Sequence, residues 1–278
     1  DNLDNIIQHL LNNKIKRSNP LVVIGGGTIQ DTASFISSIL FRGIPWIFFP
    51  TTLLAQCDSC IGSKTSINFK KYKNQLGTFY PAEKIYVYTD ILKTLSKNDI
   101  LSGLGEIIKI YYIEGKHISN LKKSLKKKDF EEMIYKSLIF KKHFIEIDEF
   151  DKKERNILNY GHTLGHALET LTNYKVPHGQ AVLLGADFAN FLSYKMDYLP
   201  YEQYKDMNEN MKEYLPEVNL EKIEISDLID ALKKDKKNVS GKLSYILTSG
   251  YGKMFKEQIE YDIIKKNLKE YIDFIKKN

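Results

Sequence analysis

The first third of the chain alternates short apolar runs with segments of helical periodicity. The runs at residues 21–24 and 46–49 are too short for helices and are flanked by glycine or proline. Continuous apolar strands that alternate with helices are typical of a parallel sheet. We therefore expect a doubly wound, Rossmann-like α/β domain, with helices over residues 3–13 and 29–41 and strands over residues 21–24, 46–49 and 85–89.

The pattern changes at about residue 96, after which almost every apolar segment has helical spacing. We expect helices over residues 98–113, 129–147, 155–172, 179–195, 201–213 and 226–236, one strand over 244–248 and a last helix after 258. The chain is thus predicted to contain an α/β domain, residues 1–95, followed by a mostly α-helical domain, residues 96–278.

Composition and charge then exclude several classes of protein. The chain has 278 residues, 42% of them hydrophobic, and its apolar runs are too short or too interrupted to cross a bilayer. The net charge of +6 comes largely from lysine runs such as Lys126–Lys128, which lack the interleaved aromatic residues of a single-strand binder. We expect no nucleic-acid or membrane partner. With two cysteines and no recognisable leader, we expect a reducing, cytoplasmic location.

The two cysteines, Cys57 and Cys60, have the C-x-x-C spacing that redox proteins and zinc sites use. A second cysteine pair for a structural zinc is absent from the sequence. The preceding strand leads into PTTLLAQ and not into a thioredoxin-type turn. We therefore regard a redox role as the weaker interpretation.

Polar side chains with metal-binding and anion-binding chemistry recur at helical spacing in the middle of the chain. Arg155, Asn159, His162 and His166 are separated by four, three and four residues, so on one helix they would lie within roughly 60° of one another. Such a stripe is too polar to pack as a core face, and it either faces water or lines a site. His178 begins the next apolar helix and could bring a further imidazole to the same place. Scattered surface histidines are the alternative.

A carboxylate could complete this group of imidazoles. Glu106 and Lys109 lie three residues apart in an apolar helix and therefore share a face. They could form a simple ion pair. Alternatively, Glu106 joins His162 and His178 in a His₂Glu metal site with an open fourth position, as in catalytic zinc sites.

Two segments of the first domain could bind phosphate groups. Gly25, Gly26 and Gly27 connect a strand to a helix, where exposed backbone N–H groups and the helix N-terminus favour a pyrophosphate. A glycine-rich tight turn is the alternative. Asp58, Lys64, Lys73 and Asn74 lie in a polar, loop-like stretch that would otherwise be a solvated loop.

Together these segments resemble the family of 3-dehydroquinate synthase and its sugar-phosphate cyclase relatives. The resemblance extends in order from about residue 20 to residue 250, with paired GH dipeptides and a later HG as its most specific part. The matching segments are GGGTIQD, RGIPWIFFPTTLLAQCDSCIGSKTSIN, KNQLGTFYPAEKIYVYTD, GLGEIIK, KKHFIEIDEFDKKERNILNYGHTLGHALE, HGQAV and DKKNVSGKLSYIL.

The resemblance implies a role for individual residues. A zinc or cobalt ion would be bound by Glu106, His162 and His178. The NAD site would contain Gly25, Gly26, Gly27, Asp31, Thr51, Thr52, Lys64 and Lys73. The substrate pocket would contain Asp58, Lys64, Asn74, Lys109, Lys141, Arg155, Asn159, His166 and Lys236, with Lys237 as a substitute for the last. Arg42 would reach the phosphate site of the other subunit of a homodimer.

The implied reaction converts 3-deoxy-arabino-heptulosonate 7-phosphate into 3-dehydroquinate with loss of phosphate, a step toward aromatic amino acids. NAD would act as a catalytic redox cofactor, and the metal would polarise the alcohol and ketone oxygens. Lys141 and Arg155 would bind the substrate carboxylate. Alternatives are a cyclase acting on sedoheptulose 7-phosphate, a metal-dependent alcohol or polyol dehydrogenase of the same fold, and a non-catalytic binding module.

The chain also departs from the family pattern at several positions. The usual G-G-K is Gly62-Ser63-Lys64, HGEAV is HGQAV with Gln180, and Lys153 replaces a glycine. The strands that precede the glycine segment in the family have no counterpart, and the chain begins at Asp1. We therefore expect a truncated nucleotide-binding sheet, with weakened NAD binding if the natural protein has this length.

Overall fold

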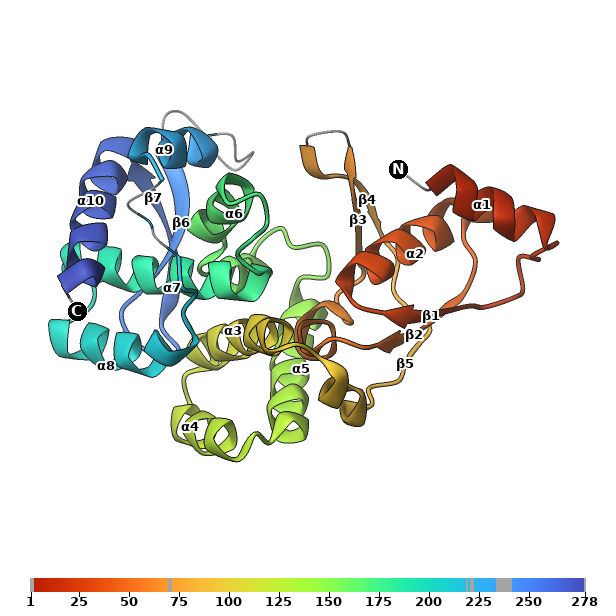
Figure 1. Ribbon diagram of the computed structural model, residues 1–278, viewed down its shortest axis with the longest axis horizontal. Helices are drawn as coiled ribbons and strands as arrows, with labels where there is room; N and C mark the ends of the chain where they lie inside the picture. Colours follow the sequence, from red (N-terminus) through yellow and green to blue (C-terminus); the bar gives the residue numbers. More distant parts are fainter. Residues whose placement is uncertain (1–2, 70–71, 219, 221–222, 234–241, 278) are drawn as a thin grey trace.

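The computed structural model describes residues 3–69, 72–218, 220, 223–233 and 242–277. An α/β part at the N-terminal end is followed by a larger, mostly helical part (Figure 1). This confirms the predicted fold class. In the described ranges no helix is long and apolar enough to span a membrane.

The α/β part contains a parallel sheet with strand order β1-β2-β5. Its elements are α1 (Leu3–Asn12), β1 (Leu21–Gly25), α2 (Gly27–Ile39), η1 (Leu40–Arg42), β2 (Trp46–Pro50), η2 (Ala55–Ser59), β3 (Lys64–Phe69), β4 (Tyr72–Phe79), β5 (Lys84–Ile85) and η3 (Thr89–Thr94). Leu21 pairs with Trp46, and Ile47 pairs with Lys84. The predicted strand 85–89 is therefore shorter than expected, because the chain turns into η3 at Thr89.

Each face of the sheet has a different environment. Val23, Trp46 and Phe48 are buried in one cluster with Ala55 and Cys60, which lie in η2 and at its end. Val22 and Ile24 alternate with Val23 along β1 and are 56% and 64% exposed. Within the described ranges, one face of this sheet is therefore packed and the other is open.

A β-hairpin occupies the polar stretch that the sequence suggested was a loop. β3 and β4 pair antiparallel, with Lys64 opposite Phe79 and Thr65 opposite Thr78. The hairpin projects from the sheet alongside the gap between the two parts of the molecule (Figure 1). Polar strands with little apolar alternation carry a weak strand signal, which is why the sequence pattern did not reveal them.

The helical part is built around α7 (His178–Lys195), in which every residue from Gly179 to Ser193 is buried. Its other elements are α3 (Lys97–Glu114), α4 (Ile118–Lys127), α5 (Phe130–Ile147), η4 (Glu154–Asn159), α6 (His162–Leu171), α8 (Tyr201–Met211), η5 (Lys212–Tyr214), α9 (Ile225–Lys233), β6 (Lys242–Thr248), β7 (Met254–Glu260) and α10 (Tyr261–Lys277). Helix α7 is therefore covered on all sides, and its buried polar residues include Asp187, which accepts hydrogen bonds from Asn208 and Tyr271.

In this part the structure corrects one prediction and adds two elements. The expected helix 155–172 is interrupted: η4 ends at Asn159 and α6 begins at His162, with Gly161 between them at φ 80°. Gly161 cannot carry a side chain because a Cβ there would lie 2.3 Å from the carbonyl oxygen of Val182. Helix α4 and strand β7 were not predicted.

Candidate metal and substrate site

Three of the predicted ligands meet where the first turns of α6 and α7 face the middle of α3. The donor atoms of Glu106, His162 and His178 all lie within 4.8 Å of one another. Glu106 Oε1 is 3.8 Å from His162 Nε2 and 3.5 Å from His178 Nε2. These positions leave space for one ion between a carboxylate and two imidazoles.

Close backbone contacts bring these ligands together. A Cβ at Gly105 would lie 2.1 Å from the carbonyl oxygen of Gly179, and one at Gly179 would lie 1.7 Å from that of Ser102. Helices α3 and α7 can therefore approach only because both positions are glycine. As a result Glu106, next to Gly105, faces His178, next to Gly179.

Burial and charge favour the ligand form of these groups. Glu106 is fully buried, and none of the described residues donates a hydrogen bond to its Oε1. Burial, reinforced by the Lys109 ammonium, lowers the pKa of His162 well below its usual value, so the ring is neutral at neutral pH. Burial opposes charge on Lys109, but Glu106 and Asp58 outweigh it and raise the pKa of Lys109, which forms a short ion pair with Glu106.

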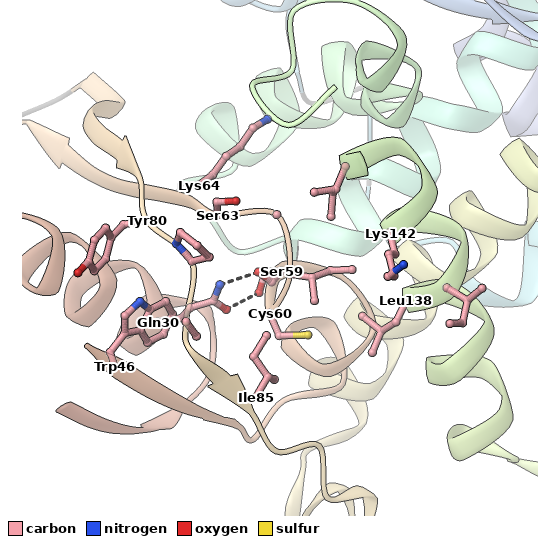
Figure 2. A pocket seen from close by; sticks show the side chains of 16 residues that line it. Gln30, Trp46, Ser59, Cys60, Ser63, Lys64, Tyr80, Ile85, Leu138 and Lys142 are labelled. Carbon is pink, nitrogen blue, oxygen red and sulfur yellow. Dashed lines mark hydrogen bonds between the residues drawn. The ribbon is translucent and has the colours of Figure 1, made fainter. Parts of the chain in front are cut away.

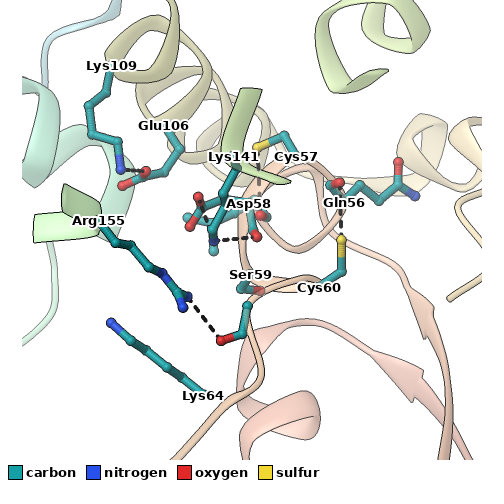
Figure 3. Close-up of polar contacts among 12 residues, drawn as sticks. Gln56, Cys57, Asp58, Ser59, Cys60, Lys64, Glu106, Lys109, Lys141 and Arg155 are labelled. Carbon is teal, nitrogen blue, oxygen red and sulfur yellow. Dashed lines mark hydrogen bonds and ion pairs between the residues drawn. The ribbon is translucent and has the colours of Figure 1, made fainter. Parts of the chain in front are cut away.

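A second acid–base pair lies beside the metal-ligand group (Figure 3). Lys141 Nζ is 3.0 Å from Asp58 Oδ1 and donates a hydrogen bond of 2.7 Å to the Asp58 carbonyl oxygen. Burial alone would raise the pKa of Asp58, but Lys141 and Lys109 outweigh it and hold that pKa below its usual value. Lys141 lies within α5, so its side chain reaches Asp58 from that helix.

Arg155, in η4, and Lys64, at the start of β3, lie beside this pair. The Arg155 guanidinium donates hydrogen bonds to the carbonyl oxygens of Glu149, at 2.5 Å, and Gly62, at 3.0 Å. Lys64 Nζ is 2.5 Å from Asp151 Oδ2. Burial outweighs Asp151 and lowers the pKa of Lys64. Four cationic side chains, those of Lys64, Lys109, Lys141 and Arg155, thus lie in the neighbourhood of Glu106 and Asp58 (Figure 3).

His166 joins the metal-ligand group, whereas other predicted residues lie apart from it. Its ring centroid is 5.2 Å from that of His162 and 5.9 Å from that of His178. Asn159 donates a hydrogen bond to the Asn156 carbonyl oxygen within η4. Asn74 is exposed on the hairpin, where its backbone N–H donates to Asn68.

Three further predictions concern positions at the margin. Arg42 is exposed at the end of η1, at φ 64°. Lys73 lies in β4, and its side chain is outside the description. Lys236 and Lys237 lie outside the described residues.

The predicted nucleotide segment forms an open turn. Gly25 ends β1, Gly26 caps α2 and Gly27 begins it. A Cβ at Gly26 would lie 2.8 Å from Thr52, whereas one at Gly27 would meet no atom within 4 Å. Thr51 donates its backbone N–H to the Gly25 carbonyl oxygen at 2.9 Å, and Asp31 follows in the second turn of α2. The turn therefore leaves backbone exposed at a helix N-terminus.

The cysteines do not have the environment of a reactive pair. Cys57 and Cys60 are both buried and lie in the π-helical turn η2 and at its end. Burial raises the pKa of Cys60 to about 12 and that of Cys57 well above its usual value. Thiols that stay protonated are poor nucleophiles, which argues against the redox interpretation.

A cavity of about 350 Å³ lies next to the start of β3, where Lys64 lines it (Figure 2). Trp46, Cys60, Leu138 and Ile145 contribute to its apolar wall, and a hydrogen-bonded pair, Gln30 and Ser59, lies at its edge. The metal-ligand residues do not line it. The cavity thus lies between the α/β part and α5.

Two acidic residues that contact the predicted site were not identified from the sequence. Asp151 pairs with Lys64, and Glu169 lies 3.1 Å from His178 Nδ1. Glu169 had a detectable signal, since it follows His162 by seven residues and therefore lies on the same helix face. Asp151 lies in an irregular segment, where spacing predicts no direction.

Comparison with known proteins identifies the family. The profile of the 3-dehydroquinate synthase N-terminal domain matches residues 1–102, and that of its C-terminal domain matches residues 103–238. The 3-dehydroquinate synthase of Alkaliphilus metalliredigens is 37% identical over 90% of this chain and 73% of its own length. That of Dictyoglomus turgidum is 38% identical over 97% of this chain and 78% of its own length.

Solved structures give the same fold. A 2-deoxy-scyllo-inosose synthase complexed with carbaglucose-6-phosphate, NAD⁺ and Co²⁺ has a TM-score of 0.88 at 25% identity, covering 96% of this chain and 78% of its own. A probable glycerol dehydrogenase from Sinorhizobium meliloti has a TM-score of 0.63 at 12% identity, covering 99% and 82%. The cyclase is thus the closer in fold of these two, and together with the profile matches and the curated relatives the result is clear: the chain belongs to the 3-dehydroquinate synthase family.

Proposed function

We propose that the chain converts 3-deoxy-arabino-heptulosonate 7-phosphate into 3-dehydroquinate and phosphate, using NAD and one divalent metal ion. The observation that carries this proposal is the group of Glu106, His162 and His178, whose donor atoms lie within 4.8 Å of one another. The cationic side chains of Lys109, Lys141 and Arg155 are buried in the same part of the molecule. A carboxylate and two imidazoles suit zinc or cobalt. Family membership and the names of the curated relatives support the same activity.

The residues present fit a metal ion and a dinucleotide. Glu106 Oε1 is buried without a hydrogen-bond donor among the described residues, which an ion would correct. The open space at Gly27 and the N-terminus of α2 would accommodate a pyrophosphate. When bound, the metal supplies a Lewis acid for substrate oxygens, and NAD supplies a reversible hydride acceptor.

The cationic side chains are proposed to hold the two anionic ends of the substrate. Lys141 and Arg155 would bind the carboxylate, for which the Arg155 fork keeps donors beyond those given to backbone carbonyls. Lys64, Asn74 and His166 would bind the phosphate. Asp58 and Lys109, which lie beside the metal-ligand group, would orient the ring hydroxyls, together with Asn159 and Lys236.

A homodimer is part of the proposal, with Arg42 completing the phosphate site of the partner subunit. Its exposure at the end of η1 leaves the guanidinium available to another chain. Mixing Arg42→Ala chains with His162→Ala chains should restore activity, because each hybrid contains one site with both residues intact. Random pairing gives about a quarter of wild-type activity in a two-fold dimer. Subunit exchange without rescue would contradict a shared site.

A phosphate-release assay tests the activity. The chain is incubated with NAD, Zn²⁺ or Co²⁺ and either 3-deoxy-arabino-heptulosonate 7-phosphate or sedoheptulose 7-phosphate. We expect phosphate from the first substrate and little from the second, with His162→Ala as the inactive control. Release from sedoheptulose 7-phosphate alone would favour the alternative cyclase. Metal and NAD binding without turnover of either substrate would contradict both.

A further inference from the structure

The His178 ring lies between two carboxylates. Its Nε2 is 3.5 Å from Glu106 Oε1, and its Nδ1 is 3.1 Å from Glu169 Oε2. Each ring nitrogen therefore faces one acidic side chain. These two directions fix both the position and the rotation of the imidazole.

Glu169 is held in place by the fold. It is only 4% exposed and lies on α6, seven residues after His162 and three after His166, so these three side chains share a helix face. A buried carboxylate is costly unless a polar partner compensates it. His178 is such a partner, and because it is the first residue of α7, the carboxylate also lies near a helix N-terminus, where negative charge is stabilised.

We infer that Glu169 is a positioning residue for His178. This inference rests on the metal site proposed above. A neutral imidazole carries its proton on one nitrogen only, and it can bind a metal through Nε2 only when that proton is on Nδ1. In this arrangement Glu169 would accept the Nδ1–H hydrogen bond and leave the Nε2 lone pair on the side of Glu106, free to bind a metal ion.

His166 gives Glu169 an alternative use that the test must separate. Donor atoms of His166, Glu169 and His178 also lie within 4.8 Å of one another, and the His166 and His178 rings are nearly parallel, at 27°. That grouping could be mistaken for a second metal site. The 3.1 Å separation of Glu169 from Nδ1 is a hydrogen-bond distance, so we assign the carboxylate to the ring and not to a second ion.

The experiment compares Glu169→Gln and Glu169→Ala with a matched control, Glu114→Gln. Glu114 Oε1 also pairs with a histidine Nδ1, that of His117 at 2.8 Å, but outside the site. Affinity for Zn²⁺ is measured by chelator competition, metal stoichiometry by elemental analysis, and ligand geometry by the visible spectrum of the Co²⁺-substituted protein. Circular dichroism of the metal-free chains verifies folding.

We expect Glu169→Ala to weaken Zn²⁺ binding by about 10- to 100-fold and to change the Co²⁺ spectrum, with one equivalent of metal in the wild type. Glu169→Gln should be intermediate, because its amide oxygen still accepts a hydrogen bond, and Glu114→Gln should match the wild type. Wild-type affinity and spectrum in a folded Glu169→Ala chain would overturn the inference, as would two equivalents of metal in the wild type that fall to one in this variant. If His178→Ala also binds Zn²⁺ normally, the proposed metal site itself is wrong.

Discussion

The metal-ligand group and the segments that carry the predicted anion-binding side chains are built in different ways. Glu106, His162 and His178 lie on three helices, two of which touch through backbone atoms at Gly105 and Gly179. Lys64 and Asn74, by contrast, lie on a projecting hairpin that follows a turn with Ser63 at φ 63°. The geometry of the proposed metal ligands is thus set by close helix packing, whereas two of the proposed phosphate-binding side chains, Lys64 and Asn74, lie on a hairpin that projects from the sheet.

The largest effect should come from the metal-ligand group. His162→Ala removes one of the three proposed protein ligands, so metal content should fall and turnover should drop by more than about 100-fold, which exceeds the loss for an outer hydrogen-bond partner. Elemental analysis after dialysis against a chelator and the phosphate-release assay measure the two effects. Stoichiometric metal retained by the variant would show that the ligand assignment is wrong.

The second-largest effect should come from Arg155, one of the two side chains proposed to bind the substrate carboxylate. Arg155→Leu should lower kcat/KM for the keto-acid phosphate by about 10- to 100-fold, since a charge-assisted bidentate contact contributes roughly 1.5–3 kcal/mol. It should lower kcat/KM little for sedoheptulose 7-phosphate, if that substrate reacts. Because Arg155 also binds the Gly62 carbonyl oxygen, thermal unfolding must be measured in parallel. Equal losses on both substrates would assign Arg155 to the phosphate or to loop structure.

A pair of glycine substitutions separates cofactor binding from packing. Gly27→Ala places a methyl group in open space, so stability should be unchanged while NAD binds about tenfold more weakly, a change of about 1.4 kcal/mol. Gly105→Ala forces α3 away from α7 and should destabilise the fold by about 1–3 kcal/mol and reduce metal content. Calorimetry measures both. Unchanged NAD affinity in Gly27→Ala would place the pyrophosphate elsewhere.

The smallest effect concerns acid stability. The folded-state pKa of Asp58 is depressed, so its pairing with Lys141 stabilises the fold above the unfolded-state pKa of about 3.9 and this contribution is lost as the pH falls through the folded-state value. Asp58→Asn should therefore cost about 1–3 kcal/mol at neutral pH, and the difference from wild type should shrink below about pH 4. Urea unfolding at several pH values measures this.

The exposed pair Asp90–Lys93 provides the control for that experiment. Asp90→Asn should leave stability unchanged, because solvent screens exposed pairs. A difference between Asp58→Asn and wild type that stays constant with pH would contradict the assignment to charge.

Much of the fold followed from hydrophobic periodicity. Strands β1 and β2 and helix α3 could be predicted because their apolar runs have a distinct length and spacing. Helix α4 was missed because its lysine run hides the apolar positions Leu121 and Leu125, which lie four residues apart. The break before α6 was missed because it arises from the close approach of Gly161 to α7, a tertiary contact that local sequence does not encode.

The site was predictable to different degrees in the two regions. His162 and His166 share a helix as expected, but Arg155 and Asn159 lie on a separate 3₁₀ segment, so the predicted four-residue stripe is not continuous. The Lys64–Asp151 and Lys141–Asp58 pairs join residues far apart in the chain, and no spacing rule reaches that distance. The relative direction of side chains on one helix can be predicted from their spacing. Contacts between residues far apart in the chain depend on the tertiary fold and cannot be predicted in this way.

The site is proposed to perform a redox-neutral cyclisation with phosphate elimination. The most direct measurement follows phosphate release and NADH absorbance together, with 3-deoxy-arabino-heptulosonate 7-phosphate in excess over NAD and the metal-loaded protein. We predict many phosphates released for each NAD, with no lasting rise at the NADH band. NADH that accumulates in step with product would contradict this account and assign the chain to net dehydrogenase chemistry.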